Sequence, residues 1–367
     1  MRAWRSAYRN LRITGQAIAL VMLVPFSQTV SADLAQQHRS GISASLESVG
    51  DQVDYSPNLP SGGFAPPQAR DRYRTGKLSY FTRVGEKIRL DADLSQREMN
   101  SLRDSFQINQ ISLAASRESG SALDEKRFSL GASLTLNHAD ELYKNSFTEY
   151  NDQLITEVRL NGSSDATLEV SARLGMSMST HWDLQFGVSS GVLQTRHSTL
   201  SGQASLDGCQ YAFSTNRGGG QIDQIGRCGA VLSLSQRYPS AKLFENRFGL
   251  DTSRDIDYFA YFVEPHLVLS WQQRIYGFSL GVKLRGYRRP DIDTRISSSG
   301  NSPVERSHTV WLNSFYDLTN RLRFSLQATY HSAAFLDSVP LLYSAFTVDR
   351  FRGDGAAFYS IRLTRFL

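Results

Sequence analysis

The chain lacks the long apolar runs and the cysteine clusters that mark several common classes of protein. After the first 32 residues no stretch approaches the roughly 18 consecutive apolar residues of a membrane-spanning helix, so none is expected. There are only two cysteines, Cys209 and Cys228, both in a Gly-rich segment. Their shared segment predicts a disulfide formed in an oxidising compartment, with two unpaired thiols as the alternative.

Motifs for bound metals and nucleotides are absent as well. The sequence contains no H-E-x-x-H, no Walker loop and no C-x-x-C, so we expect no metal and no cofactor. Two G-x-S-x-G matches, at 187–191 and 277–281, lie inside alternating segments with no helix after them. A nucleophile elbow requires a sharp strand-to-helix turn, so we predict no catalytic residue in either match.

The first 32 residues have the three parts of a signal peptide. A short apolar core at 17–26 precedes the small residues of 30–32, where a signal peptidase cuts. The basic part before the core contains Arg2, Arg5, Arg9 and Arg12 and no acid. Without these four the 40 basic residues fall to 36, against 35 acidic ones. The remaining chain is nearly neutral, which argues against a nucleic-acid partner. An uncleaved N-terminal anchor is the alternative.

The dominant pattern in the rest of the chain has a period of two. In residues 166–178 one face is wholly apolar and the opposite face carries Thr, Glu, Ser, Arg and Gly. Successive side chains of a β-strand point to opposite faces, so this pattern predicts strands with one apolar face. Similar alternation recurs in 182–189, 128–136, 276–284 and 322–330.

Three features favour a membrane barrel over a soluble sandwich. The alternating runs are about as long as the 9–11 residues of a tilted membrane-spanning strand. Short connections such as 179–181 alternate with long polar ones such as 196–226, as in bacterial outer-membrane barrels. Trp182 and Trp271 lie beside predicted tight turns, where aromatic residues suit a membrane interface. We therefore predict an all-β, antiparallel up-and-down transmembrane barrel in the outer membrane.

The last eleven residues, 357–367, resemble the closing strand of Gram-negative outer-membrane β-barrel proteins of the porin and exporter type. In that superfamily the final strand alternates and usually ends in an aromatic residue, which the barrel-assembly machinery reads. Here Tyr359, Ile361 and Leu363 keep the alternation, but Phe366 is penultimate and Leu367 is last. The resemblance implies the assembly machinery, outer-membrane lipid, lipopolysaccharide and periplasmic export factors as partners.

The pattern divides the chain into three parts. We predict a signal peptide at 1–32, a flexible periplasmic lead-in or plug at 33–75, and the barrel at 76–367. Requiring both termini on the periplasmic side makes the strand number even. Counting from residue 106 predicts twelve strands, including one at about 241–250, and a hairpin at 78–94 would make fourteen. A weakly helical stretch, 94–105, is expected to be a short periplasmic helix or turn.

If the apolar faces contact lipid, the opposite faces line the lumen. We predict that the lumen carries a basic excess, with these lining residues: Arg127, Arg159, Glu169, Arg173, Glu264, His266, Lys283, Arg285, Arg323, His331 and Arg362. A ring of Arg and Lys lowers the barrier to anions. Alternatively the charges pair and fill a narrow lumen. Glu264 and His266 share a face, so with His331 they form a weak candidate for general-base chemistry.

Three functions remain open from the sequence. The first is a channel or export barrel for small polar or anionic solutes, saccharides among them, and it predicts a continuous polar path. The second, an outer-membrane enzyme acting on lipid or lipopolysaccharide, predicts a His/Ser/acid cluster near the lipid boundary. The third, a structural or adhesion barrel, predicts a lumen filled by salt bridges and ordered external loops.

Overall fold

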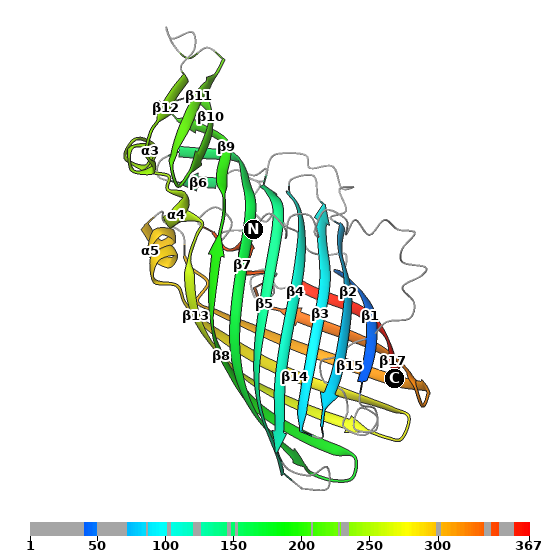
Figure 1. Cartoon of the computed structure of the whole chain (residues 1–367). Helices are drawn as coiled ribbons and strands as arrows, with labels where there is room; N and C mark the ends of the chain where they lie inside the picture. Colours follow the sequence, from blue (N-terminus) through cyan, green and yellow to red (C-terminus); the bar gives the residue numbers. More distant parts are fainter. Residues whose placement is uncertain are drawn as a thin grey trace.

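A computed structural model gives the fold of most of the chain (Figure 1). The residues described are 40–49, 72–100 except 86, 104–119, 126–144, 148–150, 153–226 except 207, 228, 235–298, 302–333, 339–344 and 356–367. The predicted signal peptide, 1–32, lies outside the described residues. No helix in these ranges is long and apolar enough to cross a membrane.

Twelve antiparallel strands form a closed barrel. In order around the barrel they are β1 (Ser40–Val49), β2 (Arg72–Val84), β3 (Ile88–Asn100), β4 (Asp104–Ser119), β5 (Lys126–Lys144), β7 (Gln153–Ser177), β8 (Trp182–Arg196), β13 (Phe259–Gln272), β14 (Tyr276–Arg288), β15 (Arg306–Thr319), β16 (Leu322–His331) and β17 (Ala356–Phe366). The first and last strands close it, with Gly41 opposite Phe366 and Val49 opposite Phe358. The predicted fold and strand number are confirmed.

The other elements lie beyond one end of the barrel and form an arm (Figure 1). They are β6 (Thr148–Tyr150), β9 (Thr199–Leu206), β10 (Cys209–Asn216), β11 (Gly219–Ile225), β12 (Ser235–Tyr238), α3 (Ala241–Phe248) and α4 (Thr252–Asp255). Helix α5 (Pro290–Ser298) and the short 3₁₀ helix η2 (Pro340–Leu342) lie in loops at the same end. The arm extends the barrel sheet, because β9 pairs with the first part of β7.

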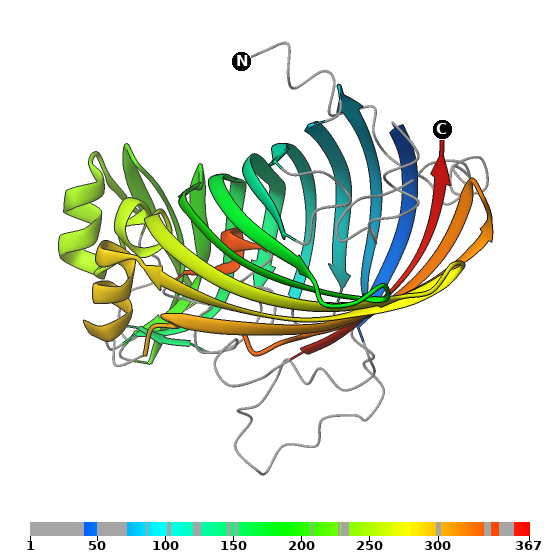
Figure 2. The same cartoon turned by 90° about the horizontal axis from the view of Figure 1, so that it is seen from below.

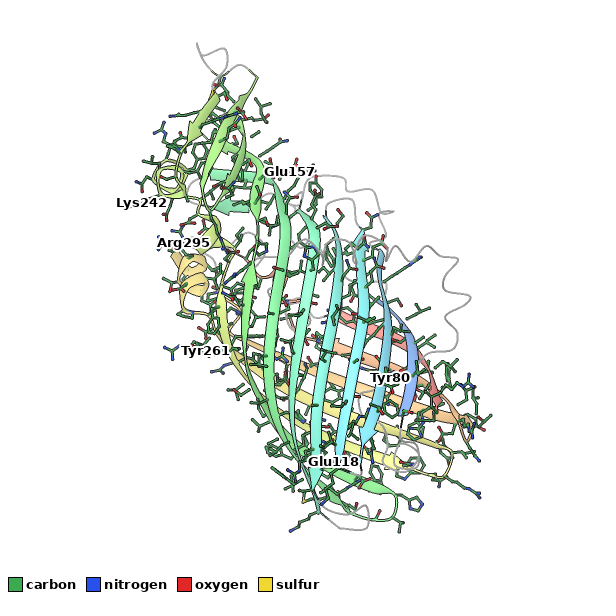
Figure 3. The ribbon with its side chains drawn as sticks, viewed as in Figure 1. Tyr80, Glu118, Glu157, Lys242, Tyr261 and Arg295 are labelled. Carbon is green, nitrogen blue, oxygen red and sulfur yellow. A yellow bond between two sulfur atoms is a disulfide. The ribbon has the colours of Figure 1, made fainter. Side chains whose placement is uncertain are left out.

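The outer surface of the barrel is apolar. Leu168, Val170 and Leu174 of β7 are 52%, 58% and 38% exposed, whereas Asp165, on the opposite face of the same strand, is 4% exposed. Tyr261 of β13 points away from the barrel (Figure 3) and is 54% exposed. An exposed apolar belt of this extent is stable only against lipid.

Both chain ends of the barrel lie at the end with the tight turns. Residues 85–87, 178–181, 273–275 and 320–321 join neighbouring strands there, and Gly85 adopts the left-handed φ of 66° that such a turn requires. Outer-membrane barrels keep short turns on the periplasmic side. The arm, α5 and η2 are therefore extracellular, and Figure 2 shows the helices grouped on one side of the barrel.

Aromatic side chains mark the two membrane interfaces. Trp182, Trp271 and Phe278 are mutual neighbours near the periplasmic turns, with ring centroids 5.6–6.5 Å apart. On β13, ten residues separate Trp271 from the outward Tyr261. They span about 33 Å of strand, or roughly 25 Å across the membrane at a tilt near 40°. This distance matches the height of an outer-membrane barrel's apolar band, and the predicted interfacial role of Trp182 and Trp271 agrees with it.

The structure corrects the predicted start of the barrel. Ser40–Val49, assigned from the sequence to a flexible lead-in or plug, is strand β1 and pairs with β2 and β17. The stretch 94–105, expected to be helical, belongs largely to β3 and pairs with β2 and β4. Along β3, Asp91, Asp93 and Arg97 on one face alternate with Leu90, Ala92 and Leu94 on the other, so the period is two.

The strand predicted at about 241–250 is helix α3. Ser240 caps it by accepting a hydrogen bond from the Leu243 N–H, and Gly249 ends it with a left-handed φ of 68°. Phe244 and Phe248, one helical turn apart, stack on each other and pack on Tyr238 and Tyr211 of the arm. From β4 onward the barrel has nine strands, not twelve, and the number twelve is reached through β1, β2 and β3, which precede residue 106.

Candidate functional site

The inner wall of the barrel carries most of the predicted lumen residues. The alternation of each strand places ten of them on the inner face: Arg127, Glu169, Arg173, Glu264, His266, Lys283, Arg285, Arg323, His331 and Arg362. All ten belong to strands of the closed barrel. The candidate site is therefore the polar lumen itself.

Arg159 is the exception to the predicted lining. It lies on β7 beyond the barrel rim, bonds to Glu157 at 2.7 Å and stacks on Tyr143. Gly162 explains the error, because its φ of 59° interrupts the alternation of β7. Val158 and Leu160 then take the buried face, and Arg159 is left 44% exposed on the opposite one.

One side of the lumen is a charge cluster on β7, β13 and β14. Glu264 is 7% exposed and accepts hydrogen bonds from Lys283 at 3.2 Å and Arg285 at 2.6 Å. Arg285 also reaches Glu169 at 4.0 Å. Because the Glu264 carboxylate already accepts hydrogen bonds from two cations, it is not positioned to act as a general base.

The opposite side of the barrel carries a second cluster, on β2, β3 and β17 with partners on β4 and β16. Lys77 and Asp93 form an ion pair at 3.1 Å. Arg97 donates to Gln110 and Arg362 donates to Gln327, both at 3.2 Å. Strands β2 and β13 are six places apart among the twelve, so the two clusters face each other across the lumen.

Two further ion pairs lie nearer the periplasmic end. Arg127 contacts Asp183 at 3.0 Å. Arg323 contacts Asp317 at 2.6 Å, and both side chains are nearly fully buried. Like the pairs above, these join strands at most three places apart around the barrel. The ion pairs thus run along the wall and do not bridge its opposite sides.

Arg173 differs from the other inner cations. It is exposed, and it forms no ion pair with any residue that the structure describes. Its side chain lies beside Gly187, where a Cβ would come within 3.1 Å of Arg173 Cγ. An unneutralised guanidinium on the lumen wall attracts anions and repels cations.

Large inner side chains lie over glycines of the adjacent strand. His266 lies opposite Gly187, where a Cβ would be 2.2 Å from the ring. Equivalent close approaches, each between direct cross-strand partners, are Phe262 on Gly191, Phe315 on Gly277, Trp311 on Gly281 and Phe81 on Gly41. Glycine in a strand marks a site of close approach. These rings lie along the wall, so they occupy less of the lumen than rings projecting from it.

These glycines also explain the G-x-S-x-G matches. Both matches are strand segments, in β8 and β14, as expected, and their four glycines receive large side chains from neighbouring strands. Nor do the predicted histidines form an acid–base group. Glu264 bonds to Lys283 and Arg285, while His331 bonds to Thr309 at 3.0 Å on β15. Within the described ranges no group of three or more His, Cys, Asp or Glu is placed to hold a metal.

A short stretch of the β16–β17 loop lies at the extracellular end of the barrel. We call Val339–Ser344, which contains η2, the mouth segment. It contacts β7 and β8, on the side of the barrel opposite β16 and β17, and the Leu341 backbone hydrogen-bonds Asp165. Val339 and Leu341 are completely buried in a hydrophobic core that continues into the arm.

The mouth segment is held from the side of α5. Tyr343 donates a hydrogen bond to Asp293, and Tyr258 donates one to the Pro340 carbonyl at 2.9 Å. Arg289 is 2% exposed and stacks between the rings of Tyr287 and Tyr343, at 4.0 and 3.8 Å. Burial raises the pKa of the Asp293 carboxyl, although Tyr343 and Arg289 act in the opposite direction.

The base of the arm has a buried polar anchor. Asp257 accepts hydrogen bonds from the His197 N–H at 2.7 Å and from Arg217, and its carboxylate also contacts His197 Nδ1 at 3.1 Å. Burial alone would raise the pKa of Asp257, but its bonds with His197 and Arg217 hold that pKa below the usual value. At the far end of the arm Cys209 and Cys228 form the predicted disulfide.

Several acidic residues of the inner wall are not among the predicted lining residues. Asp183 and Asp317 neutralise two of the predicted arginines, and Asp93 pairs with Lys77. The signal was available, because Asp183 alternates with the outward Trp182 and Leu184. The predicted basic excess is therefore largely neutralised by partners on the same wall, and Arg173 is its exposed remainder.

A closed barrel with an apolar outer belt, a polar inner wall and interfacial aromatics defines the class of the protein. The chain is an outer-membrane β-barrel protein.

Comparison with solved structures returns proteins of the same architecture. The fold is similar to the translocator domain of the autotransporter NalP from Neisseria meningitidis (TM-score 0.47, 10% identity, 100% of this chain and 97% of that one). It is also similar to the NanC porin (0.38, 7%, 89% and 99%) and to the toluene transporter TodX from Pseudomonas putida (0.39, 10%, 94% and 95%). No family model and no curated protein sequence matches the chain.

Proposed function

We propose that the barrel is a channel for small polar solutes with a preference for anions. The observation that carries this proposal is the inner wall. Its ion pairs join nearby strands of the same wall, its large rings lie over glycines, and Arg173 is exposed with no ion-pair partner among the described residues. Charges neutralised on their own side leave a polar surface that water and solutes wet.

The mouth segment supports selection by size. It lies against β7 and β8 at the extracellular end and is fixed by buried apolar side chains and two tyrosine hydroxyls. A segment held this firmly narrows the entrance, which favours small solutes over polymers. The same end carries the ordered arm, so solutes would enter beside it.

The experiment is single-channel recording in a planar bilayer with a salt gradient. We expect steady channel openings and a reversal potential that indicates selectivity for anions. Arg173→Gln should move the reversal potential towards cation selectivity with conductance retained, because it removes the exposed cation. Arg274→Gln, in a periplasmic turn, is the matched control and should leave it unchanged. A correctly folded but silent barrel contradicts the proposal.

The arm favours a second function, binding to a partner at the cell surface. It holds the part of the hydrophobic core that contains Phe213, Ile222 and Phe244, a disulfide at its tip and a buried anchor at its base. Ordered external structure of this kind is what an adhesion barrel requires. Shortening the arm between His197 and Asp257 tests this, since loss of surface binding with conductance preserved would separate the two functions.

A further inference from the structure

Four aromatic rings on the inner wall lie over glycines, and three of them are covered on the other side by an arginine. Arg89 lies 4.6 Å from the ring centre of Phe81, Arg285 lies 4.6 Å from that of Phe262, and Arg323 lies 3.9 Å from that of Phe315. The three phenylalanines are accordingly buried, at 0%, 3% and 8% exposure. A cation–π contact with an arginine thus occupies one face of each of these three phenylalanine rings.

Trp311 is the fourth ring, and its lumen face is open. A Cβ at Gly281 would lie 2.1, 2.3 and 2.7 Å from three atoms of the indole, so the ring lies across the glycine with one face on the wall. No cation of the described chain lies over the other face, and Trp311 is half-buried, unlike the three phenylalanines. The largest aromatic side chain of the lumen is therefore available to a ligand.

The groups around Trp311 are mostly uncharged hydrogen-bonding groups. Thr329 lies opposite it on β16, and Gln327 donates to Thr329 at 2.9 Å. Asn313 and Ser279 face each other one inner position away, and Asn313 Oδ1 and Ser279 Oγ are buried without a partner among the described residues. Hydroxyl and amide groups beside an aromatic ring match a ligand with an apolar face and a polar rim.

Positive charge nearby makes a cationic ligand unfavourable. Lys283 lies opposite Thr309, two residues from Trp311, and Arg362 is hydrogen-bonded to Gln327. A cation over the indole would approach both of these groups, whereas a neutral or anionic ligand would not be repelled. Among ligands that can stack on an aromatic ring, these positive charges therefore favour neutral or anionic ligands over cationic ones.

We propose that Trp311 is a stacking platform for the ring of a saccharide that enters the lumen. The C–H face of a pyranose would cover the indole, and its hydroxyls would bond to Gln327, Thr329 and, after small rotations, Asn313 and Ser279. The platform rests on the proposed channel function for access, and it gives that function a solute class. Lys283 and Arg362 extend the site to sugars that carry a carboxylate.

The test is isothermal titration calorimetry of the full detergent-solubilised chain with a glucose trisaccharide. Trp311→Leu fills a similar space without an aromatic face, and we expect binding about tenfold weaker. Trp311→Phe should retain part of the affinity. Leu312→Ala, at the adjacent outward position, is the matched control and should bind like the native chain. Folding of each variant is checked by its shift on heating in gel electrophoresis.

Calorimetry does not depend on conduction, so the two proposals fail separately. A native barrel that does not bind the trisaccharide, or a Trp311→Leu variant that binds it equally well, overturns the platform even when ion currents are normal. A barrel that binds sugar through Trp311 but carries no current supports the platform and contradicts the channel. Concentration-dependent interruption of the native current by the same sugar supports both.

Discussion

At the scale of single residues, glycine determines where the large inner side chains lie. Gly187 and Gly281 are each covered by a ring that crosses from the next strand. The sequence alternation predicts that these glycines face inward, because they share a face with Ser189 and Ser279. It does not predict which ring covers which glycine, since that depends on strand register.

Gly281→Ala is expected to displace Trp311. The added Cβ would lie within 2.7 Å of three indole atoms, and overpacking of this kind costs about 1–3 kcal/mol. Urea unfolding should show the loss of stability, and trisaccharide binding should weaken as well. Gly286→Ala on the same strand meets nothing within 4 Å and should change neither. Equal behaviour of the two variants would contradict the packing described for Trp311.

Arg159 shows why a residue-level prediction from alternation can fail. Glu169 and Arg173 were placed correctly because no irregularity separates them from the apolar residues that set the face. Between Ser163 and Leu160, the left-handed backbone at Gly162 shifts the alternation. A glycine in a strand can mark such a shift, but nothing local in the sequence shows that its φ is positive.

At the scale of elements, the mouth segment is the part most directly linked to function. Tyr343→Phe removes the hydroxyl that bonds to Asp293 while leaving the ring on Arg289. Loss of one such bond costs about 1 kcal/mol, so the displaced segment should become roughly fivefold more populated. Single-channel recording should then show more frequent transitions to a larger conductance. Tyr330→Phe, on the outer surface, is the control, and identical traces from both variants would exclude this role.

The anchor at the base of the arm should weaken in acid. The pKa of Asp257 is lower in the folded chain than the unfolded value near 3.9. Its contribution is therefore present above about pH 4 and is lost as the pH falls through the folded pKa. Hydrogen exchange at 217–219, corrected for intrinsic rates, should show easier opening between pH 5 and 3. In the Asp257→Asn variant the free energy of opening at 217–219 should be lower by about 1–3 kcal/mol at pH 6. The variant should also lose this pH dependence. If the Asp257→Asn variant kept the same pH dependence of opening, the acid effect would come from another group.

The elements differ in how far the sequence predicts them. The segments 166–178 of β7, 182–189 of β8, 276–284 of β14 and 322–330 of β16 follow from alternation alone, because each has an apolar outer face. Strands β9 to β12 alternate as well, yet they lie in the arm, so alternation does not separate the barrel from its extension. Helix α3 was missed because the even strand number was taken to require a strand at about 241–250, although its two buried phenylalanines are four residues apart, as in a helix.

At the scale of the whole molecule, closure depends on a pairing that no local pattern encodes. Strand β1 precedes β17 by more than 300 residues, and the Ser- and Gly-containing segment 40–49 has only a weak alternation. The predicted number of twelve is right, but three of the strands, β1 to β3, precede residue 106, from which the sequence count was made. In the closed barrel Phe366 points inward and is 1% exposed, while Leu367 is 50% exposed. Leu367 thus takes the outward terminal position that an aromatic residue usually occupies.

The central claim is that the inner face of these strands lines a conducting lumen. The most direct test is a single cysteine at the inward Ser171 or at the outward Leu174, because both native cysteines are in the disulfide. A charged, membrane-impermeant thiol reagent should reduce the single-channel current of Ser171→Cys in one step and leave that of Leu174→Cys unchanged. A silent barrel, or the reverse pattern of modification, would contradict the account.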